Sequence, residues 1–152
     1  MKKFEFTGET KTISLFFRTA TLHRIRAVAE FGLVKIGDLG GWIEKEENLS
    51  HEGKAWVCGD AEVCGDAEVF SASHVLVIGA IGSRDDFTTF FRDKDNEITV
   101  KCGCFLGKID KFLEKVTQTH GDSKYALVYR AAVEVARLQI DLSGEAPKDA
   151  DE

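Results

Sequence analysis

Proline is nearly absent from this sequence, with one residue in 152, and long apolar runs are missing altogether. A membrane-spanning helix needs about 20 consecutive apolar residues, so we expect none here. The first residues, Met1 to Glu5, contain two lysines and a glutamate but no apolar stretch, which is unlike a signal peptide. These absences predict a cytoplasmic protein in which the four cysteines stay reduced.

Common catalytic motifs are also absent. The chain has no Gly-x-x-x-x-Gly-Lys-Ser/Thr loop, no Gly-x-Ser-x-Gly and no His-Glu-x-x-His. The carboxylates of Glu44, Glu46 and Glu47 form a charged run, which is typical of a solvated surface. Cys58 and Cys64 offer two thiols, whereas a structural zinc ion needs four ligands. We therefore expect no catalytic residue, no metal and no cofactor.

Positive charge is the scarcer sign, because 20 Lys and Arg are set against 26 Asp and Glu, for a net charge of -6. Generic nucleic-acid binding depends on cationic neutralisation of phosphates, so this balance argues against it. Part of the acidic excess lies in residues 143–152, beside the single proline, and this tail is predicted to be disordered. Local basic sites remain compatible with the composition.

A six-residue period recurs in CGDAEVCGDAEVFSASHV, residues 58–75. Valine begins each unit, alanine or serine lies two residues earlier, and Gly-Asp separates the first units. Hexapeptide periodicity is a signature of parallel β-helices, in which the valines point inward. We predict a short β-helix over 37–82, an N-terminal β cap over 1–36, and an outward position for His74. So short a stack needs other structure or other copies to cover its ends, which favours a homo-oligomer.

The segment before the repeat supports this fold by resemblance. Residues 31–57, FGLVKIGDLGGWIEKEENLSHEGKAWV, resemble the entry motif of the YdcK-like β-solenoid proteins of bacteria, prophages and phages. Together with the hexads, the resemblance covers residues 22–82. It implies a solenoid fold and a phage or prophage source, and it implies no activity. Trp42 and Trp56 flank the first turn, where they would either close the open end of the stack or anchor a partner.

The period changes after residue 82. A β-prone segment at 87–91, a turn at 93–96 and an alternating segment at 97–105 predict a hairpin. Two segments with helical spacing follow, and their expected core stripes are Ile109, Phe112, Leu113 and Val116, then Val128, Ala131, Ala132, Val135 and Leu138. The predicted fold class is therefore mixed α/β (α+β), with a hexapeptide-repeat β-helix followed by a ββαα module over 83–142.

Five residues of the second module are candidates for ligand binding. They are Arg84 in a Gly-Ser-Arg loop, Lys101 and Phe105 on the polar face of the second strand, and Arg130 and Arg137 on the last helix. Arginine forks bind phosphate and a phenyl ring stacks on a base, so these residues together would suit a small anionic nucleotide. Alternatively, the arginines alternate with acidic residues in a stripe that is only a solvated surface. The sequence leaves both interpretations open.

Residues 81–140 carry a second resemblance, through the Gly-Ser-Arg loop, the strand end at 103–105 and the arginines of the last helix. They are similar to a module of uncharacterised phage proteins and, in layout, to the phage Thoeris anti-defence nucleotide-sponge family. That family sequesters immune signals of the cyclic ADP-ribose type without cleaving them, in pockets that oligomerisation completes. The resemblance implies a non-enzymatic phage counter-defence protein that binds a cyclic nucleotide or a cyclic ADP-ribose.

Two other functions fit the same sequence. The net charge of -6 would suit an acidic, anti-CRISPR-like inhibitor that binds a host defence protein and mimics nucleic acid, with Glu62 and Glu68 at its surface. The open coil would instead suit a purely structural assembly protein, which uses the end of the stack as an interface between copies. The sequence does not choose between these alternatives.

Overall fold

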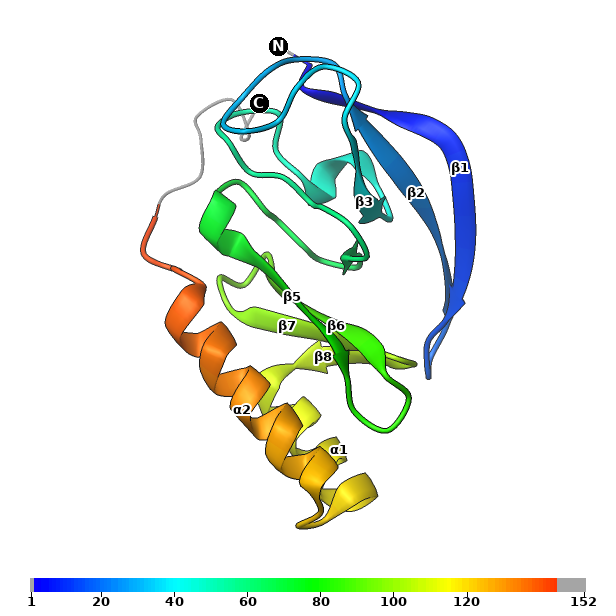
Figure 1. Cartoon of the computed structure of the whole chain (residues 1–152), viewed down its shortest axis with the longest axis vertical. Helices are drawn as coiled ribbons and strands as arrows, with labels where there is room; N and C mark the ends of the chain where they lie inside the picture. Colours follow the sequence, from blue (N-terminus) through cyan, green and yellow to red (C-terminus); the bar gives the residue numbers. More distant parts are fainter. Residues whose placement is uncertain (1, 145–152) are drawn as a thin grey trace.

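Two four-stranded sheets and two C-terminal α-helices make up the computed structural model, which describes residues 2–144 (Figure 1). The first sheet has the order β1-β2-β3-β4 and the second has the order β5-β6-β7-β8. The elements are β1 Phe4–Ser14, β2 Thr19–Ala27, β3 Leu39–Ile43, β4 Glu62–Val63, β5 Val75–Ile81, β6 Asp86–Arg92, β7 Ile98–Cys102, β8 Phe105–Lys108, α1 Ile109–His120 and α2 Lys124–Gln139. We call residues 2–74 the first half and residues 75–144 the second half.

The hexapeptide repeat does not form a β-helix, so the predicted fold class is wrong. The repeat valines are buried as expected, since Val57, Val63 and Val69 are each at most 1% exposed. Parallel contacts between coils are few, however: β4 has only two residues beside β3, and one further bridge joins Leu49 to Val69. A stack of so few coils cannot stabilise itself. The repeat instead forms turns that share a core with the long β1–β2 hairpin.

The last part of the predicted repeat, from Val75 onward, forms strand β5 instead of another coil. This strand pairs antiparallel with β6, with Val75 opposite Phe91, and β7 and β8 continue the sheet in antiparallel order. The predicted hairpin is therefore the middle of a four-stranded sheet. The expected boundary at residues 82 and 83 lies in the turn between two paired strands.

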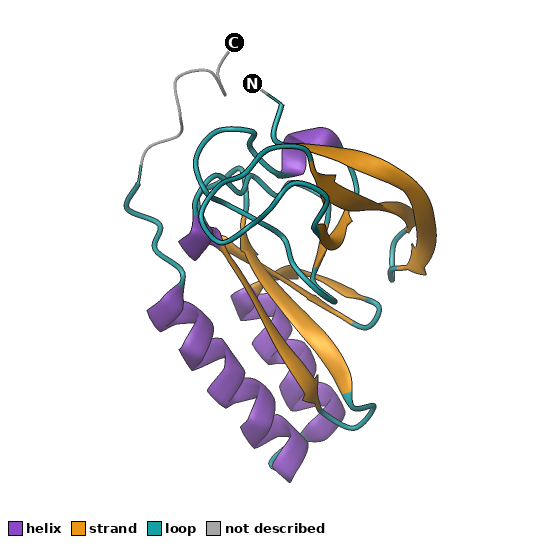
Figure 2. Cartoon of the chain, turned by 45° about the horizontal axis from the view of Figure 1, so that its top comes forward, coloured by secondary structure: helices purple, strands orange, loops and turns teal. Residues whose placement is uncertain are grey.

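The second sheet is a middle layer with a hydrophobic core on each face. Phe90 packs in the core formed with α1 and α2, whereas Phe91 packs in the core of the first half, and both side chains are fully buried. Successive side chains of a strand point to opposite faces, which explains how neighbours in sequence belong to different cores. The helices and the first sheet accordingly lie on opposite sides of the second sheet (Figures 1 and 2).

The two helices differ in how well their sequence predicts their packing. Helix α1 buries Ile109, Phe112 and Val116, which confirms its predicted stripe, and it ends at Gly121 in a positive-φ conformation. Helix α2 is rotated from its predicted orientation, because it buries Ala126, Tyr129, Ala132, Val133 and Ala136 and leaves Ala131, Val135 and Leu138 exposed. Apolar residues occupy more than one side of α2, and the side with three alanines packs against the sheet.

Buried polar side chains hold the irregular loops of the first half. The Asn48 side-chain amide donates to the carbonyl oxygens of Gly65 and Ala67, each at 3.1 Å. The Lys3 ammonium donates to the Ala55 carbonyl oxygen at 2.6 Å, and burial lowers the pKa of Lys3 to about 8. These bonds satisfy backbone groups that have no partner strand.

No helix among residues 2–144 is both long and apolar enough to cross a membrane. The tail that was expected to be disordered, residues 143–152, lies outside the described residues from position 145 onward.

Candidate functional site

The five predicted ligand residues do not meet in one pocket. Lys101 and Phe105 were expected on one face of a strand, but β7 ends at Cys102, and the turn through Gly103, at φ +56°, reverses the chain before Phe105. The two side chains consequently lie on opposite faces of the second sheet. The shared face predicted for them is wrong.

Lys101 is a structural cation between the two halves. It is 5% exposed, and its ammonium lies 2.8 Å from the Glu62 carboxylate, which Lys11 also contacts at 2.6 Å. Burial alone would raise the pKa of Glu62, but hydrogen bonds from Lys101 and Lys11 outweigh it and hold the pKa below its usual range. Glu62 is therefore no freely exposed acidic group, contrary to what an acidic mimic of nucleic acid requires.

Phe105 belongs to the core beneath the helices. Its ring centroid lies 5.4 Å from that of Phe112, and it packs against the buried cluster of the second half. Phe105 is only partly buried, but its ring is engaged in this packing and faces away from Lys101. We therefore remove Lys101 and Phe105 from the candidate site.

The two arginines of α2 have local partners. One guanidinium nitrogen of Arg130 donates to the Gly121 carbonyl oxygen at 3.1 Å and to the Thr117 hydroxyl at 3.3 Å, at the C-terminal end of α1. A cation at this position complements the helix dipole. Arg137 pairs with Glu134 at 3.0 Å on the exposed surface, as the solvated-stripe interpretation predicts.

Arg84 is different, because its exposed side chain makes no hydrogen bond or ion pair with any described residue. It lies in the β5–β6 turn, two residues after Gly82 at φ +82°. A Cβ atom at Gly82 would overlap the hydroxyl of Tyr129 on α2, so glycine is required for this approach. The turn that carries Arg84 thus packs directly on Tyr129.

Aromatic rings surround the Tyr129 contact. The ring of Tyr129 stacks on His120 at 5.7 Å between centroids, and His120 lies 5.7 Å from the ring of Tyr125, which is 43% exposed. Burial, together with the nearby Cys102 and Asp86, raises the pKa of Tyr129 to about 12, although Arg84 acts in the opposite direction. Tyr129 therefore stays protonated at neutral pH. We call Arg84, His120, Tyr125 and Tyr129 the Arg84 cluster.

Sequence reasoning identified only Arg84 in this cluster. Tyr125 and Tyr129 are four residues apart on α2, a spacing that places two rings on neighbouring turns of one helix face. His120 was interpreted only as part of a helix end. The sequence signal for this cluster is an aromatic pair at i, i+4 on one helix, preceded by a histidine at the end of the helix before it.

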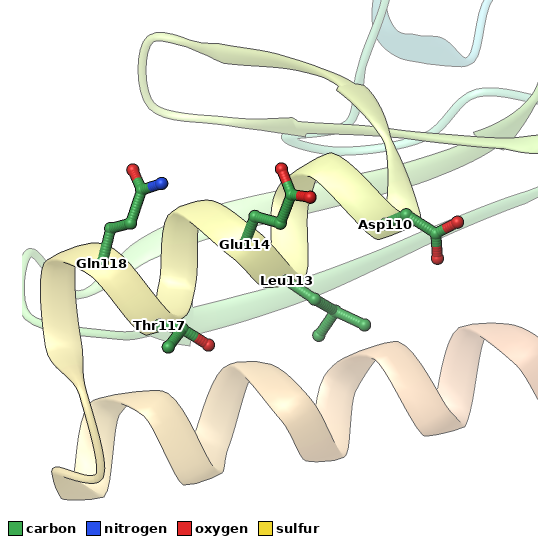
Figure 3. A pocket seen from close by; sticks show the side chains of 5 residues that line it. All are labelled: Asp110, Leu113, Glu114, Thr117 and Gln118. Carbon is green, nitrogen blue, oxygen red and sulfur yellow. The ribbon is translucent and has the colours of Figure 1, made fainter.

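A hollow on the surface of α1 offers a poor site for an anion. It has a volume of about 480 Å³ and is lined by Asp110, Leu113, Glu114, Thr117 and Gln118, all from α1 (Figure 3). Two of these five side chains are carboxylates, which repel phosphate. None of the five residues expected to bind a ligand lines this hollow, although Arg130 contacts Thr117 at its wall.

Several other expectations about polar residues are corrected by the structure. His74 is buried at 1% exposure rather than outward, and its Nδ1 accepts a hydrogen bond from the Phe70 amide at 3.3 Å. Glu44 is no isolated surface acid, because Arg18 binds both of its carboxylate oxygens, at 2.6 and 3.0 Å. The local sequence does not reveal that the Phe70 amide binds His74 or that Arg18 binds Glu44, because these partners depend on the fold.

The thiols and acids provide no metal centre among the described residues, where no group of three or more His, Cys, Asp or Glu side chains converges. All four cysteines are free thiols. Burial raises the pKa of Cys64 to about 12, so this thiol stays protonated and unreactive.

Comparison with known proteins gives no family for this chain. No protein-family model matches it, and no curated protein sequence matches it. The resemblances to YdcK-like proteins and to the Thoeris anti-defence family stay predictions.

Proposed function

We propose that this protein is a non-catalytic, cytoplasmic binding protein that retains a small anionic nucleotide at the Arg84 cluster. The observation that carries the proposal is the exposed guanidinium of Arg84, which has no hydrogen-bond or ion-pair partner among residues 2–144 and is close enough to the Tyr129 hydroxyl to influence its pKa. Guanidinium groups form paired, charge-assisted hydrogen bonds with phosphate oxygens. An arginine without an internal partner can use all its donors for a ligand.

The rings of the cluster supply the second element of nucleotide binding. Tyr125 is 43% exposed and lies next to His120, so a base can stack at this end of the helices. Stacking of a base on an aromatic side chain contributes about 1–3 kcal/mol. The Tyr129 hydroxyl interacts with the Cys102 thiol and stays protonated, because its pKa is raised to about 12, and it supports the site by packing against the turn at Gly82.

Acidic neighbours favour a ligand of low total charge. Asp85 and Asp86 follow Arg84 directly, and both are exposed. A second or third phosphate would lie close to these carboxylates, at a Coulombic cost. A cyclic nucleotide, in which ring closure removes a phosphate charge, suits this site better than a triphosphate.

A counter-defence protein that sequesters a nucleotide signal needs only to bind the nucleotide and does not need to cleave it. In this proposal the ligand is held and released unchanged. The phage origin implied by resemblance stays a prediction.

Native mass spectrometry with a panel of cyclic nucleotides and cyclic ADP-ribose isomers tests the proposal, with inorganic phosphate as a probe for a simple anion site. We expect one panel member to be retained and recovered at unchanged mass. Arg84→Ala should weaken its binding roughly tenfold or more, because a charge-assisted hydrogen bond contributes about 1.5–3 kcal/mol. Retention of none of these ligands would contradict the proposal.

Matched arginine variants locate the site. Arg137→Ala removes another exposed arginine, which already pairs with Glu134, and it should leave affinity unchanged. Arg130→Ala loosens the contact to Gly121 near His120 and should weaken binding less than Arg84→Ala does. If Arg84→Ala and Arg130→Ala both bind as the unmodified chain does, the site lies elsewhere.

The acidic-inhibitor alternative receives less support from the geometry. Glu62 lies between Lys11 and Lys101, and Glu68 interacts with Arg92 at 3.5 Å. Glu62 is thus held by two cations within the chain, whereas the Glu68 side chain remains 51% exposed. Salt-sensitive capture of a host nuclease that survives Arg84→Ala would favour this alternative over nucleotide retention.

A further inference from the structure

The exposed side of α2 is apolar where a solvated helix would be polar. Val135 is 46% exposed and Leu138 is 88% exposed, while Ala131 is exposed and Val128 is half-buried. We call these four residues the α2 flank. They occupy positions i, i+3, i+7 and i+10 of one helix and form a continuous stripe.

The α2 flank faces away from α1. Arg130 marks the side toward α1, because it binds Gly121 and Thr117 there. At 100° per residue, the α2 flank is rotated from Arg130 by roughly 80–160°. Because α2 contacts β5 whereas α1 contacts β7 and β8, the side of α2 opposite α1 is the side nearer the β5 edge of the second sheet. Val128 and Val135, at about 160° and 140° from Arg130, are the flank residues that turn most toward this edge.

Strand β5 leaves its outer backbone edge unpaired. It is the first strand in the order β5-β6-β7-β8, and among the described residues its only backbone partner strand is β6. Its side chains Val75 to Ile78 contribute to the cores on both faces of the sheet, yet each is only half-buried. The corresponding residues of β6, from Thr88 to Arg92, are all buried. The β5 side chains are more exposed than those of β6 because, among the described residues, no strand lies along the outer edge of β5.

A single two-fold axis can relate both the β5 strands and the α2 helices of two copies. Helix α2 runs antiparallel to β5, because the Asp141 amide donates to the Ser73 carbonyl oxygen at 3.3 Å while Tyr129 contacts Gly82 at the other end. The middle of β5 and the middle of α2 therefore lie side by side. A two-fold axis beside the middle of β5 passes close to Val135.

Charge favours a second copy at this surface. Two chains of net charge -6 repel each other, so a self-interface must avoid facing carboxylates. No charged residue occurs in β5, and none occurs in the α2 flank. Arg130 and Arg137 lie on another side of α2, whereas Glu134 borders the α2 flank beside Ala131 and Leu138, and Lys124 lies one turn before Val128.

We infer that this chain forms a two-fold symmetric homodimer, in which the β5 edges of two copies pair antiparallel and their α2 flanks pack together. The two four-stranded sheets then form one continuous sheet. Pairing is confined to Val75–Ile78, because the register of β5 shifts between Ile78 and Ile81. Antiparallel pairing of identical edges satisfies both strands equally, as an isologous interface requires.

The helices fit the same arrangement. Ala131 and Val135 lie on an i, i+4 ridge, and ridges of this kind pack into each other at about -50°. The small side chain of Ala131 permits close approach of the helices, while Val135 and Leu138 supply the buried apolar area. The dimer thus removes from water apolar side chains of α2 that the monomer leaves exposed.

Light scattering coupled to size exclusion, together with native mass spectrometry, tests the dimer without any ligand. We expect twice the 16.8 kDa of one chain at micromolar concentration. Hydrogen exchange of the Val75–Ile78 amides should slow as concentration rises through the dissociation constant. A single-chain mass, or a trimer or other assembly without a two-fold axis, would overturn the inference.

Exposed substitutions identify the surface. Val135→Glu and Ala131→Glu place like charges across the two-fold axis, and each should raise the dissociation constant by roughly a hundredfold or more. Leu33→Glu adds the same charge at a residue that is 97% exposed in the first half, and it should leave the dimer intact. Circular dichroism checks that each variant is folded. A dimer that persists in Val135→Glu, or that Leu33→Glu disrupts equally, would show that another surface associates.

Discussion

The two halves of this protein are stabilised in different ways. The second half consists of antiparallel strands joined by backbone ladders and covered by two helices. In the first half, residues 44–74 follow loops whose backbone groups are satisfied largely by turns and by buried side chains such as Asn48. Regular elements need only an apolar pattern, whereas irregular loops need particular polar residues at particular positions.

The repeat shows why this difference arises. Small residues and valines at a six-residue spacing bury well in turns, and Ala55, Ala61 and Ala67 are all at most 2% exposed. The spacing does not by itself provide a neighbouring coil for each strand to pair with. With so few coils, the chain satisfies its backbone through side chains and through the second sheet.

Phe90 and Phe91 offer the largest test of the comparison, because these adjacent residues serve different cores. Phe90→Ala and Phe91→Ala should each lower the free energy of unfolding by about 3–5 kcal/mol, since each leaves a cavity in place of a fully buried ring. Hydrogen exchange should then separate them: Phe90→Ala exposes α1 and α2 first, and Phe91→Ala exposes residues 43–69 first. Identical exchange patterns in the two variants would mean that the cores are one cooperative unit.

Asn48 tests the role of polar side chains in the first half. Asn48→Ala should lower the free energy of unfolding by about 2 kcal/mol, because it leaves the carbonyl oxygens of Gly65 and Ala67 buried without donors. Chemical denaturation measures the loss. The exposed Gln139→Ala is the control, and its effect should stay within about 0.5 kcal/mol. Equal stability of both variants would refute the distinction drawn between the halves.

Asp93 tests the principal buried acid of the second half. Burial would raise the pKa of Asp93, but hydrogen bonds from Lys108 at 2.7 Å, Thr99 at 2.6 Å and backbone amides outweigh it and hold the pKa below its usual range. At a pH between the pKa of Asp93 in the folded chain and its pKa in the unfolded chain, the unfolded chain therefore binds more protons. Stability is fully present above the unfolded pKa of about 3.9 and is lost as the pH falls below it.

Asp93→Asn should remove this acid sensitivity and lower stability at neutral pH by roughly 1–2 kcal/mol. Urea unfolding across the acid range measures both effects. Asp95→Asn changes an exposed partner of the same lysine and should retain the pH dependence. If Asp93→Asn loses stability over the same acidic pH range as the unmodified chain, other carboxylates cause the acid sensitivity.

The sequence predicts buried positions better than it predicts partners. The repeat valines and the α1 stripe are buried as expected, because apolar periodicity reports directly on burial. The pairing of β5 with β6 was missed, because Val75 continues the hexad spacing while its backbone joins another sheet. The face of α2 was assigned wrongly because apolar residues cover more than one side of the helix.

The candidate site was predicted less completely than the fold. Arg84 lies in an exposed turn as the Gly-Ser-Arg loop indicates, but Lys101 and Phe105 are separated by the turn at Gly103. One positive-φ glycine changes which residues share a face. Ion pairs such as Lys101 with Glu62 join residues far apart in sequence, and alternation within a single segment carries no information about them.

The sharing of β6 between the two cores also has a consequence for biosynthesis. The core of the first half includes Phe91 and Leu106, which follow it in the chain. The ribosome therefore releases the hexapeptide region before the residues that cover it exist. Valines 57, 63 and 69 stay accessible to chaperones until β6 and β8 have been synthesised, so the final step of folding for the N-terminal region waits on the C-terminal one.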